Sequence, residues 1–379
     1  MKLGTWHLKL LLAFTIAVPA AVAKDPPATG DKVPGYEAVD KAVLDFMALV
    51  DAQSATVAVS KDGKLLYSRG FGYADAAKKK PTPPDTLMRI ASVSKPITAA
   101  LVKTAIREKQ LDADAKAFDL IGAKPPGKAK VADERIKDVT VKQLLEHKGG
   151  WDRDKAEDPM FRADLVAQEL KLTHPAKPAD MVSYMLTQPL QFEPGTKEAY
   201  SNFGYCVLGR VLETVSKKPY ADCVQDGICK PLGIKDIKLG FAAVKKRDPR
   251  EVWYPVGEDA FSFDVMDSHG GLIASAPALC EFMGAYWVSG ERREKDQWGD
   301  GTFFGSLPGT TSMVRQRKDG FNAAVLFNNR RTKSYKEDND TLKKSVDDAL
   351  DKLAEKNRTY AVGQFGVNHG GRGGYNGDR

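Results

Sequence analysis

The chain has 379 residues, of which 42% are apolar and 28% charged, and its formal net charge is +7. A chain of this length can bury a large core, and the composition is that of a globular protein, which excludes wholesale disorder. Four cysteines are too sparse for a disulfide scaffold.

The N-terminus has the pattern of a secretory signal peptide. Lys2 and Lys9 form a basic start, "LLLAFTIAV" is an apolar middle, and small residues ending at Ala23 form a cleavage site. The alternative is a lone N-terminal anchor, but the apolar run is shorter than the roughly 20 residues that cross a bilayer. We therefore expect residues 1–23 to be removed. The mature protein is then exported, periplasmic or secreted, with no integral membrane segment.

The N-terminal half begins with strand and helix signals. Residues 24–39 are rich in proline and glycine and predict a linker. After a stretch with apolar residues at helical spacing, two alternating runs around Asp62-Gly63 predict a β-hairpin. Residues 92–110 predict a helix, and a mostly helical stretch follows.

Strand signals return near the C-terminus. Two β runs flank Asp319-Gly320, and "DNDTLKKSVDDALDKLAEK" predicts an amphipathic closing helix. These elements predict an α/β fold with one antiparallel sheet built from both chain ends and an inserted helical lobe, over residues 40–358. The Gly/Arg-rich residues 359–379 predict a disordered, solvated tail, and we expect no nucleic-acid partner.

The cysteines have no metal-ligand spacing and no C-x-x-C pair. Cys280 lies in an apolar helix-like stretch and predicts a free buried thiol. Export would permit a disulfide among Cys206, Cys223 and Cys229, and its pairing is left open.

The first candidate for chemistry is Ser92 with Lys95 three residues later, in "RIASVSKPITA". A serine is a poor nucleophile until a base takes its proton, and lysine can be that base when its pKa is lowered. Helical spacing puts both side chains on one face. The alternative is a capped helix with a surface lysine, which the two-letter motif alone favours.

The second candidate is Tyr200-Ser201-Asn202, in a loop just before a helix. A tyrosine beside an ammonium group can ionise more easily and shuttle a proton, and an asparagine can hold a lysine or a substrate amide. Taken alone, a buried tyrosine with a helix-capping asparagine is the more common arrangement.

Together, "RIASVSKPITA", "PGTKEAYSNFGY" and "GSLPGTTSMVRQRKDGFNAAVLFNNR" resemble the serine β-lactamase-like family of class C β-lactamases, D-alanyl-D-alanine peptidases and related esterases. The resemblance covers roughly residues 40–355, and three motifs fall in order on a helix start, a loop and a strand before a hairpin. It implies a two-lobed β-lactamase/penicillin-binding-protein-like fold with the site between the lobes.

The resemblance also implies roles. Ser92 would be the acylated nucleophile, and Lys95 and Tyr200 would share the proton transfers, with the identity of the base left open. Asn202 would bind substrate, and the backbone N–H groups of Ser92 and Ser306 would form the oxyanion hole.

The third motif departs from the family pattern. The family has Lys-Thr-Gly or His-Ser/Thr-Gly, whereas this chain has Phe303-Phe304-Gly305, so a phenylalanine takes the cationic position. We expect Phe303 and Gly305 to line the cleft and Phe304 to face the core. The alternative is that Phe303 is core and a nearby Arg or Lys supplies the charge. Trp151 is a further candidate for the cleft wall.

Motifs for other catalytic mechanisms are absent from the sequence: it contains no G-x-S-x-G, H-E-x-x-H, P-loop or G-x-G-x-x-G. His147, His174 and His269 are a thin supply for a metal site, so we expect no metal or cofactor. His269 satisfies H-x-G as letters, but it precedes a helix, and we expect a structural histidine.

The sequence therefore predicts an exported serine hydrolase that cleaves a small ester, an amide or a cell-wall peptide through an acyl-enzyme. Esterase or peptidase activity is favoured over strong β-lactamase activity because of Phe303. The alternative is a non-catalytic module that binds cell-wall peptides or a protein partner in the same cleft. The oligomeric state is left open.

Overall fold

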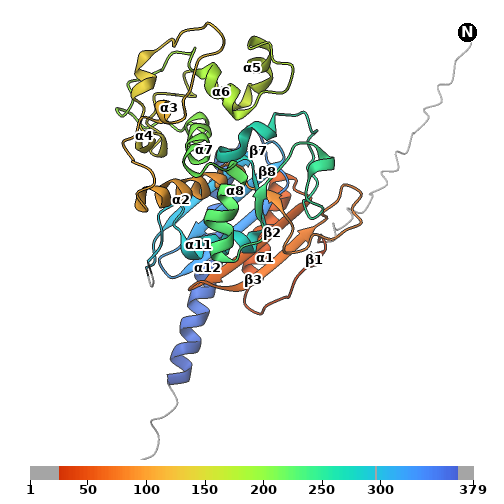
Figure 1. Ribbon diagram of the computed structural model, residues 1–379. Helices are drawn as coiled ribbons and strands as arrows, with labels where there is room; N and C mark the ends of the chain where they lie inside the picture. Colours follow the sequence, from red (N-terminus) through yellow and green to blue (C-terminus); the bar gives the residue numbers. More distant parts are fainter. Residues whose placement is uncertain (1–24, 295–296, 366–379) are drawn as a thin grey trace, which may run out of the picture.

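The computed structural model describes residues 25–294 and 297–365, shown in colour in Figure 1. The predicted signal peptide, residues 1–23, lies outside the described residues, as does most of the predicted tail. Within the described ranges, no helix combines the length and the hydropathy needed to cross a membrane.

A six-stranded antiparallel sheet is the central layer, in the order β1-β3-β2-β9-β8-β7. Its strands are β1 (Ala28–Thr29), β2 (Ser54–Lys61), β3 (Lys64–Gly72), β7 (Gly301–Leu307), β8 (Thr310–Gln316) and β9 (Phe321–Phe327). The central pair, β2 and β9, joins the two ends of the chain, with Val57 opposite Val325. The sheet from both termini is therefore confirmed. Its first hairpin turns at Asp62-Gly63, where both residues have positive φ (52° and 77°), as a tight two-residue turn requires.

Side-chain alternation gives each face of the sheet its own helical layer. Val57 and Val325 belong to the core under α1 (Glu37–Val50) and α12 (Tyr335–Phe365), whereas Ala58 belongs to the main core. On that second face lies α11 (Ala276–Ala285), whose Cys280 thiol contacts the Ala58 carbonyl at 3.5 Å. The segment between the two halves of the sheet is therefore not confined to the helical lobe, because α11 packs on the sheet.

The helical lobe sits at the opposite end of the molecule from the projecting end of α12 (Figure 1). Besides α11, the helices that lie between β3 and β7 in the chain are α2 (Ser94–Arg107), α3 (Ala117–Leu120), α4 (Val141–Leu145), α5 (Ala163–Glu169), α6 (Pro178–Met185), α7 (Asn202–Ser216), α8 (Tyr220–Val224), α9 (Lys230–Leu232) and α10 (Asp267–Gly270). The single-turn segments are η1 (Ala91–Val93), η2 (Glu134–Asp138), η3 (Pro159–Phe161), η4 (Gln225–Cys229), η5 (Val244–Lys246) and η6 (Phe263–Met266). A second sheet has three strands, in the order β4 (Met88–Arg89), β6 (Leu272–Ala274) and β5 (Ile237–Leu239).

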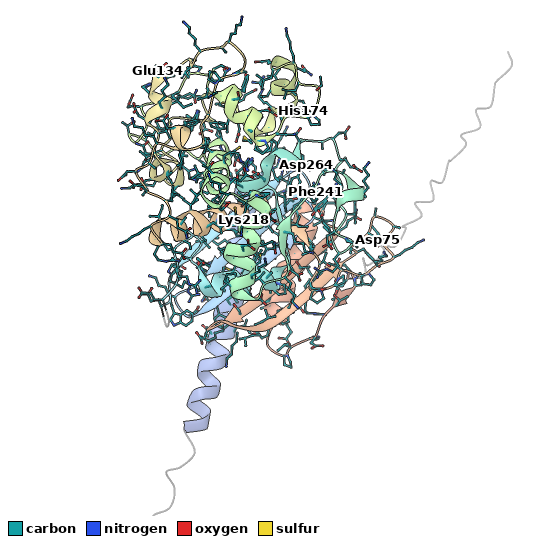
Figure 2. The ribbon with its side chains drawn as sticks, viewed as in Figure 1. Asp75, Glu134, His174, Lys218, Phe241 and Asp264 are labelled. Atoms are coloured by element: carbon teal, nitrogen blue, oxygen red, sulfur yellow. The ribbon has the colours of Figure 1, made fainter. Side chains whose placement is uncertain are left out.

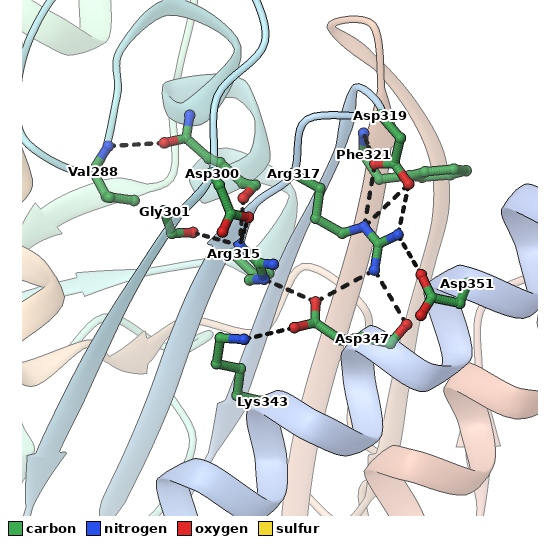
Figure 3. A network of polar contacts seen from close by, with 11 residues as sticks. Val288, Asp300, Gly301, Arg315, Arg317, Asp319, Phe321, Lys343, Asp347 and Asp351 are labelled. Carbon is green, nitrogen blue, oxygen red and sulfur yellow. Dashed lines mark hydrogen bonds and ion pairs between the residues drawn. The ribbon is translucent and has the colours of Figure 1, made fainter.

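Partly buried ion pairs hold α12 against the sheet (Figure 3). Arg315 in β8 donates to Asp347 at 2.8 Å, and Arg317 donates to Asp351 at 2.6 Å. The Arg315–Asp347 pair is 7% and 18% exposed and is therefore screened less than a surface pair, whereas Asp351 is 61% exposed. The helix continues to Phe365, past the domain boundary predicted at residue 358.

The structure corrects two expectations, one about the N-terminal linker and one about the cysteines. Residues 24–39 are not a free linker: β1 pairs with β3 (Ala28 opposite Phe71), and the Pro27 carbonyl accepts from the Gly72 N–H at 2.8 Å. The outer edge of β3 has backbone N–H and C=O groups without partners in the rest of the sheet, and β1 forms hydrogen bonds with them. All four cysteines are free buried thiols, which confirms the expectation for Cys280 and rules out the bridge considered among the other three.

Candidate active site

Ser92 lies on a strained turn at the junction of the sheet and the helical lobe. The turn is η1, which runs directly into α2, and Ala91 has a φ of 47°, a left-handed value that residues with a Cβ rarely adopt. The Ser312 hydroxyl of β8 donates to the Ile90 carbonyl at 2.7 Å. A Cβ on Gly305 of β7 would come within 2.2 Å of that same carbonyl oxygen. The sheet therefore holds this turn in place. Gly305 lets the β7 backbone pack directly against the turn, and it does not line the cleft as we expected.

Lys95 is fully buried one turn after Ser92, with 0% of its surface exposed. Its Nζ donates to the Asn202 Oδ1 at 2.6 Å and to the His269 carbonyl at 2.7 Å, and lies 3.4 Å from the Ser92 Oγ. Burial holds the pKa of Lys95 well below its ordinary value; the negative charge of Asp158 opposes this shift. The neutral amine is therefore favoured here more than on a surface lysine.

Tyr200 meets Ser92 from the other side. Its phenol donates to the Ser92 Oγ at 2.7 Å, and its ring stacks on His147, with 4.7 Å between the ring centroids. Burial raises the pKa of Tyr200 to about 12, although the hydrogen bond to Ser92 and the charge of Arg153 lower it. The expected easier ionisation of this tyrosine is thus wrong, because the loss of solvation outweighs the neighbouring positive charges. At neutral pH Tyr200 is a proton donor.

Asn202 opens α7 and links Lys95 to a residue that sequence reasoning missed. Its Nδ2 donates to the Asp158 Oδ2 at 2.6 Å, while its Oδ1 faces Lys95. Asp158 also caps η3, since its Oδ1 accepts from the Met160 N–H at 3.1 Å. The helix cap of α7 is Ser201, whose hydroxyl accepts from Gly204. The only sequence signal for Asp158 is the mixed acidic and basic loop "WDRDKAEDPMFR" in which it lies, and interleaved charges of this kind more often form salt bridges.

Two histidines border this cluster in the neutral form. The Ser201 N–H donates to the His147 Nδ1 at 3.1 Å, and burial lowers the pKa of His147 to about 3. His269, in α10, supplies its backbone carbonyl to Lys95, and burial holds its pKa well below the ordinary value. His174, labelled in Figure 2, is exposed in the helical lobe, and its Nδ1 contacts the Pro175 carbonyl at 2.8 Å. In the described part of the chain, no group of three or more potential metal ligands occurs.

A cavity of about 450 Å³ opens onto Ser92. Its walls include Ser92, Tyr200, Asn202, His269, Phe304, Ser306, Arg330 and Tyr335. Phe303 is absent from the described lining and packs against the main core. We expected Phe303 to line the cleft and Phe304 to face the core, and the structure shows the reverse. Because side chains alternate along β7, Phe304 and Ser306 lie on the cavity face and Phe303 on the other.

Arg330 brings a positive charge into this cavity. It follows β9 in the chain, and its NH1 donates to the Ser306 hydroxyl at 3.0 Å. Its guanidinium lies 5.7 Å from the centre of the Tyr335 ring. The alternative considered for the third motif, in which Phe303 is core and an arginine supplies the charge, agrees with this arrangement.

Trp151 lines a second, adjoining cavity rather than the one at Ser92. This cavity has a volume of about 230 Å³ and shares Arg153, Tyr200 and Asn202 with the first. Trp151 is only 4% exposed, and its ring packs edge-on against Phe203. The expectation that it forms a wall of the Ser92 cleft is therefore wrong, since most of the ring is used in the core.

Comparison with known proteins decides the family. The family model described as Beta-lactamase matches residues 39–378. The chain belongs to the beta-lactamase family. This confirms the family that the three motifs indicated, and with it the relation to serine hydrolases.

The sequence relatives of this beta-lactamase family member include a fimbrial assembly protein and an esterase. It is 31% identical over 255 residues to a probable fimbrial assembly protein FimD of serogroup H1 from Dichelobacter nodosus, covering 63% of this chain and 59% of that protein. It is 29% identical over 251 residues to Esterase EstB from Burkholderia gladioli, covering 61% of this chain and 59% of that protein. The chain thus spans about three fifths of the length of these relatives.

Solved structures confirm the β-lactamase/penicillin-binding-protein-like fold. A D-amino acid amidase from Ochrobactrum anthropi superposes with a TM-score of 0.63 at 18% identity, covering 86% of this chain and 100% of that one. A Beta-lactamase/D-alanine Carboxypeptidase from Yersinia pestis gives a TM-score of 0.63 at 17% identity, covering 83% of this chain and 98% of that one.

Proposed function

We propose that this protein hydrolyses an ester or amide through an acyl-enzyme formed on Ser92. One observation carries the proposal: the Ser92 Oγ opens onto a cavity and lies 2.7 Å from the Tyr200 phenol and 3.4 Å from the buried Lys95 amine. A hydroxyl between a low-pKa amine and a phenol has both a proton acceptor and a proton donor within reach.

In the first step, Lys95 is the base. The neutral amine takes the Ser92 proton as the Oγ bonds to the substrate carbonyl carbon, and the carbonyl π electrons move to its oxygen. Tyr200 cannot be the resting base at neutral pH, because its pKa is raised to about 12. The backbone N–H groups of Ser92 and Ser306, two residues that border the same cavity, are proposed to bind the oxyanion.

Collapse of the tetrahedral intermediate breaks the bond to the leaving group. The leaving oxygen or nitrogen takes a proton from the Tyr200 phenol, and the proton held on Lys95 restores the phenol. Water then attacks the acyl-enzyme while Lys95 accepts its proton, and the same proton returns to the Ser92 Oγ as the acid product leaves. The cycle is balanced and uses the chain's own groups.

The substrate class rests on charge as well as on chemistry. The relatives named above include an esterase and a D-amino acid amidase, which supports carbonyl substrates of both kinds. Phe303 gives no reason to favour esterase or peptidase activity over β-lactamase activity, because Phe304 and Arg330 line the cavity instead. We propose that Arg330 gives the site a preference for substrates that carry a carboxylate, including peptides with a free C-terminus. On the N-terminal sequence alone, we also propose that the protein acts after export.

The test is covalent labelling of the full chain. Intact mass is measured after incubation with a fluorophosphonate, p-nitrophenyl esters, a D-Ala-D-Ala peptide and a cephalosporin, for the native protein and for Ser92→Ala. The proposal predicts one adduct, on Ser92. Ligand binding with no adduct from any of these compounds would instead support the non-catalytic binding module.

A further inference from the structure

We propose that Asp158 is a positioning residue that sets the orientation of the Asn202 amide, and through it the direction in which Lys95 presents its free electron pair. This inference rests on the proposed function of Ser92 and Lys95. Asp158 lies in the loop before η3 and touches neither Ser92 nor the space above it; its effect passes through Asn202.

The orientation follows from what each group can donate. An ionised carboxylate only accepts hydrogen bonds, so the Asn202 group that faces the Asp158 Oδ2 at 2.6 Å must be the Nδ2. The Oδ1 of Asn202 is then turned toward Lys95, 2.6 Å from its Nζ. A flipped amide would set Oδ1 against the Asp158 carboxylate, acceptor against acceptor.

The consequence for Lys95 is directional. A neutral lysine amine has two N–H donors and one free electron pair. The Asn202 Oδ1 and the His269 carbonyl accept the two N–H groups, so the electron pair is left for the Ser92 Oγ at 3.4 Å. If the Asn202 amide flipped, its N–H would instead donate to that electron pair and compete with the Ser92 proton.

Asp158 is itself held in place. Its Oδ1 caps η3 by accepting from Met160, and the basic groups that face it are Lys95 and Arg153. Burial is the largest influence and raises the pKa of Asp158, although the Met160 and Asn202 hydrogen bonds and the two basic groups oppose the shift. The two accepted N–H bonds are those that an ionised carboxylate satisfies.

A double-mutant cycle tests the inference. Asp158→Ser keeps a capping hydroxyl for Met160 but is too short to hold the Asn202 amide. At a pH where kcat no longer changes, we expect kcat to fall by about 10- to 100-fold with KM nearly constant. In an Asn202→Ala background the same change should have less than about a twofold further effect, because residues that act through one another are not additive. Equal losses in both backgrounds, or no loss in the native one, would overturn the inference.

A second readout covers the case in which Asp158→Ser does not fold. Asp158→Asn keeps the shape and removes the charge that favours the Lys95 ammonium, so the acid limb of kcat/KM should move to lower pH. Asp154→Asn is the matched control, since it makes the same change at an exposed position of the same loop and should leave the limb in place. The inference also predicts a lower plateau kcat in Asp158→Asn, because an amide at position 158 no longer selects one orientation of the Asn202 amide; a native plateau kcat overturns the inference. Loss of Ser92 labelling in the native protein would instead overturn the proposed function.

Discussion

Arg330→Gln tests how the cavity treats the charge of a substrate. The native guanidinium is partly buried, lies at the cavity wall and donates to the Ser306 hydroxyl at 3.0 Å. A charge-assisted hydrogen bond contributes about 1.5–3 kcal/mol, which corresponds to roughly 10- to 100-fold in kcat/KM for a carboxylate-bearing substrate. For a neutral substrate, Arg330→Gln should lower transition-state stabilisation only through the weakened contact with Ser306, by about 1 kcal/mol or less.

The assay is kcat/KM for a matched ester and its carboxylate analogue, in the native protein and in two variants. Arg330→Gln should change the ratio between the two substrates by about tenfold or more, against the carboxylate. Phe303→His is the control, because residue 303 is partly buried against the main core, lies outside the described cavity lining and should leave the ratio unchanged. A ratio that moves with Phe303→His and not with Arg330→Gln would refute this reasoning and restore the prediction made from the third motif.

Three further predictions concern the residues around Ser92. Lys95→Ala should lower kcat by about 100- to 10,000-fold, and a loss below tenfold would rule out its role as the base. In the native protein, activity requires neutral Lys95 and is lost as pH falls through its lowered pKa, so a pH profile of kcat/KM should show an acid limb well below 10.5; a limb at or above that value would contradict the burial argument. Gly305→Ala places a Cβ 2.2 Å from the Ile90 carbonyl oxygen, and urea unfolding should show a loss of about 1–3 kcal/mol together with slower labelling of Ser92; unchanged stability would show that the turn can yield.

The parts of the fold that sequence predicted are those with local signals. The turn at Asp62-Gly63 needs two residues that tolerate positive φ, and the sequence supplies both between alternating apolar runs. The three-residue spacing of Ser92 and Lys95 likewise fixes their shared face once a helix begins. The pairing of β1 with β3 has no such local signal. β1 is only two residues long, which is too short to show an alternating pattern, and its partner strand lies about 40 residues later in the chain.

The parts of the site that sequence missed depend on burial and on distant partners. Alternation along β7 shows that Phe303 and Phe304 point to opposite faces, but which face borders the cavity is decided by the neighbouring turn at Ser92. Tyr200 has positive charges nearby, yet its pKa rises, because desolvation is a property of the packed molecule. Arg330 contacts Ser306 from the loop between β9 and α12, 24 residues later in the chain, so no short motif contains both residues.

Intact mass spectrometry with a fluorophosphonate shows whether Ser92 is a working nucleophile. We expect a single adduct on the native protein, mapped to the peptide that contains Ser92, and no adduct on folded Ser92→Ala. The proposed mechanism is wrong if native protein stays unlabelled while an established serine hydrolase is labelled in the same tube, or if the Ser92→Ala protein is labelled at the native rate.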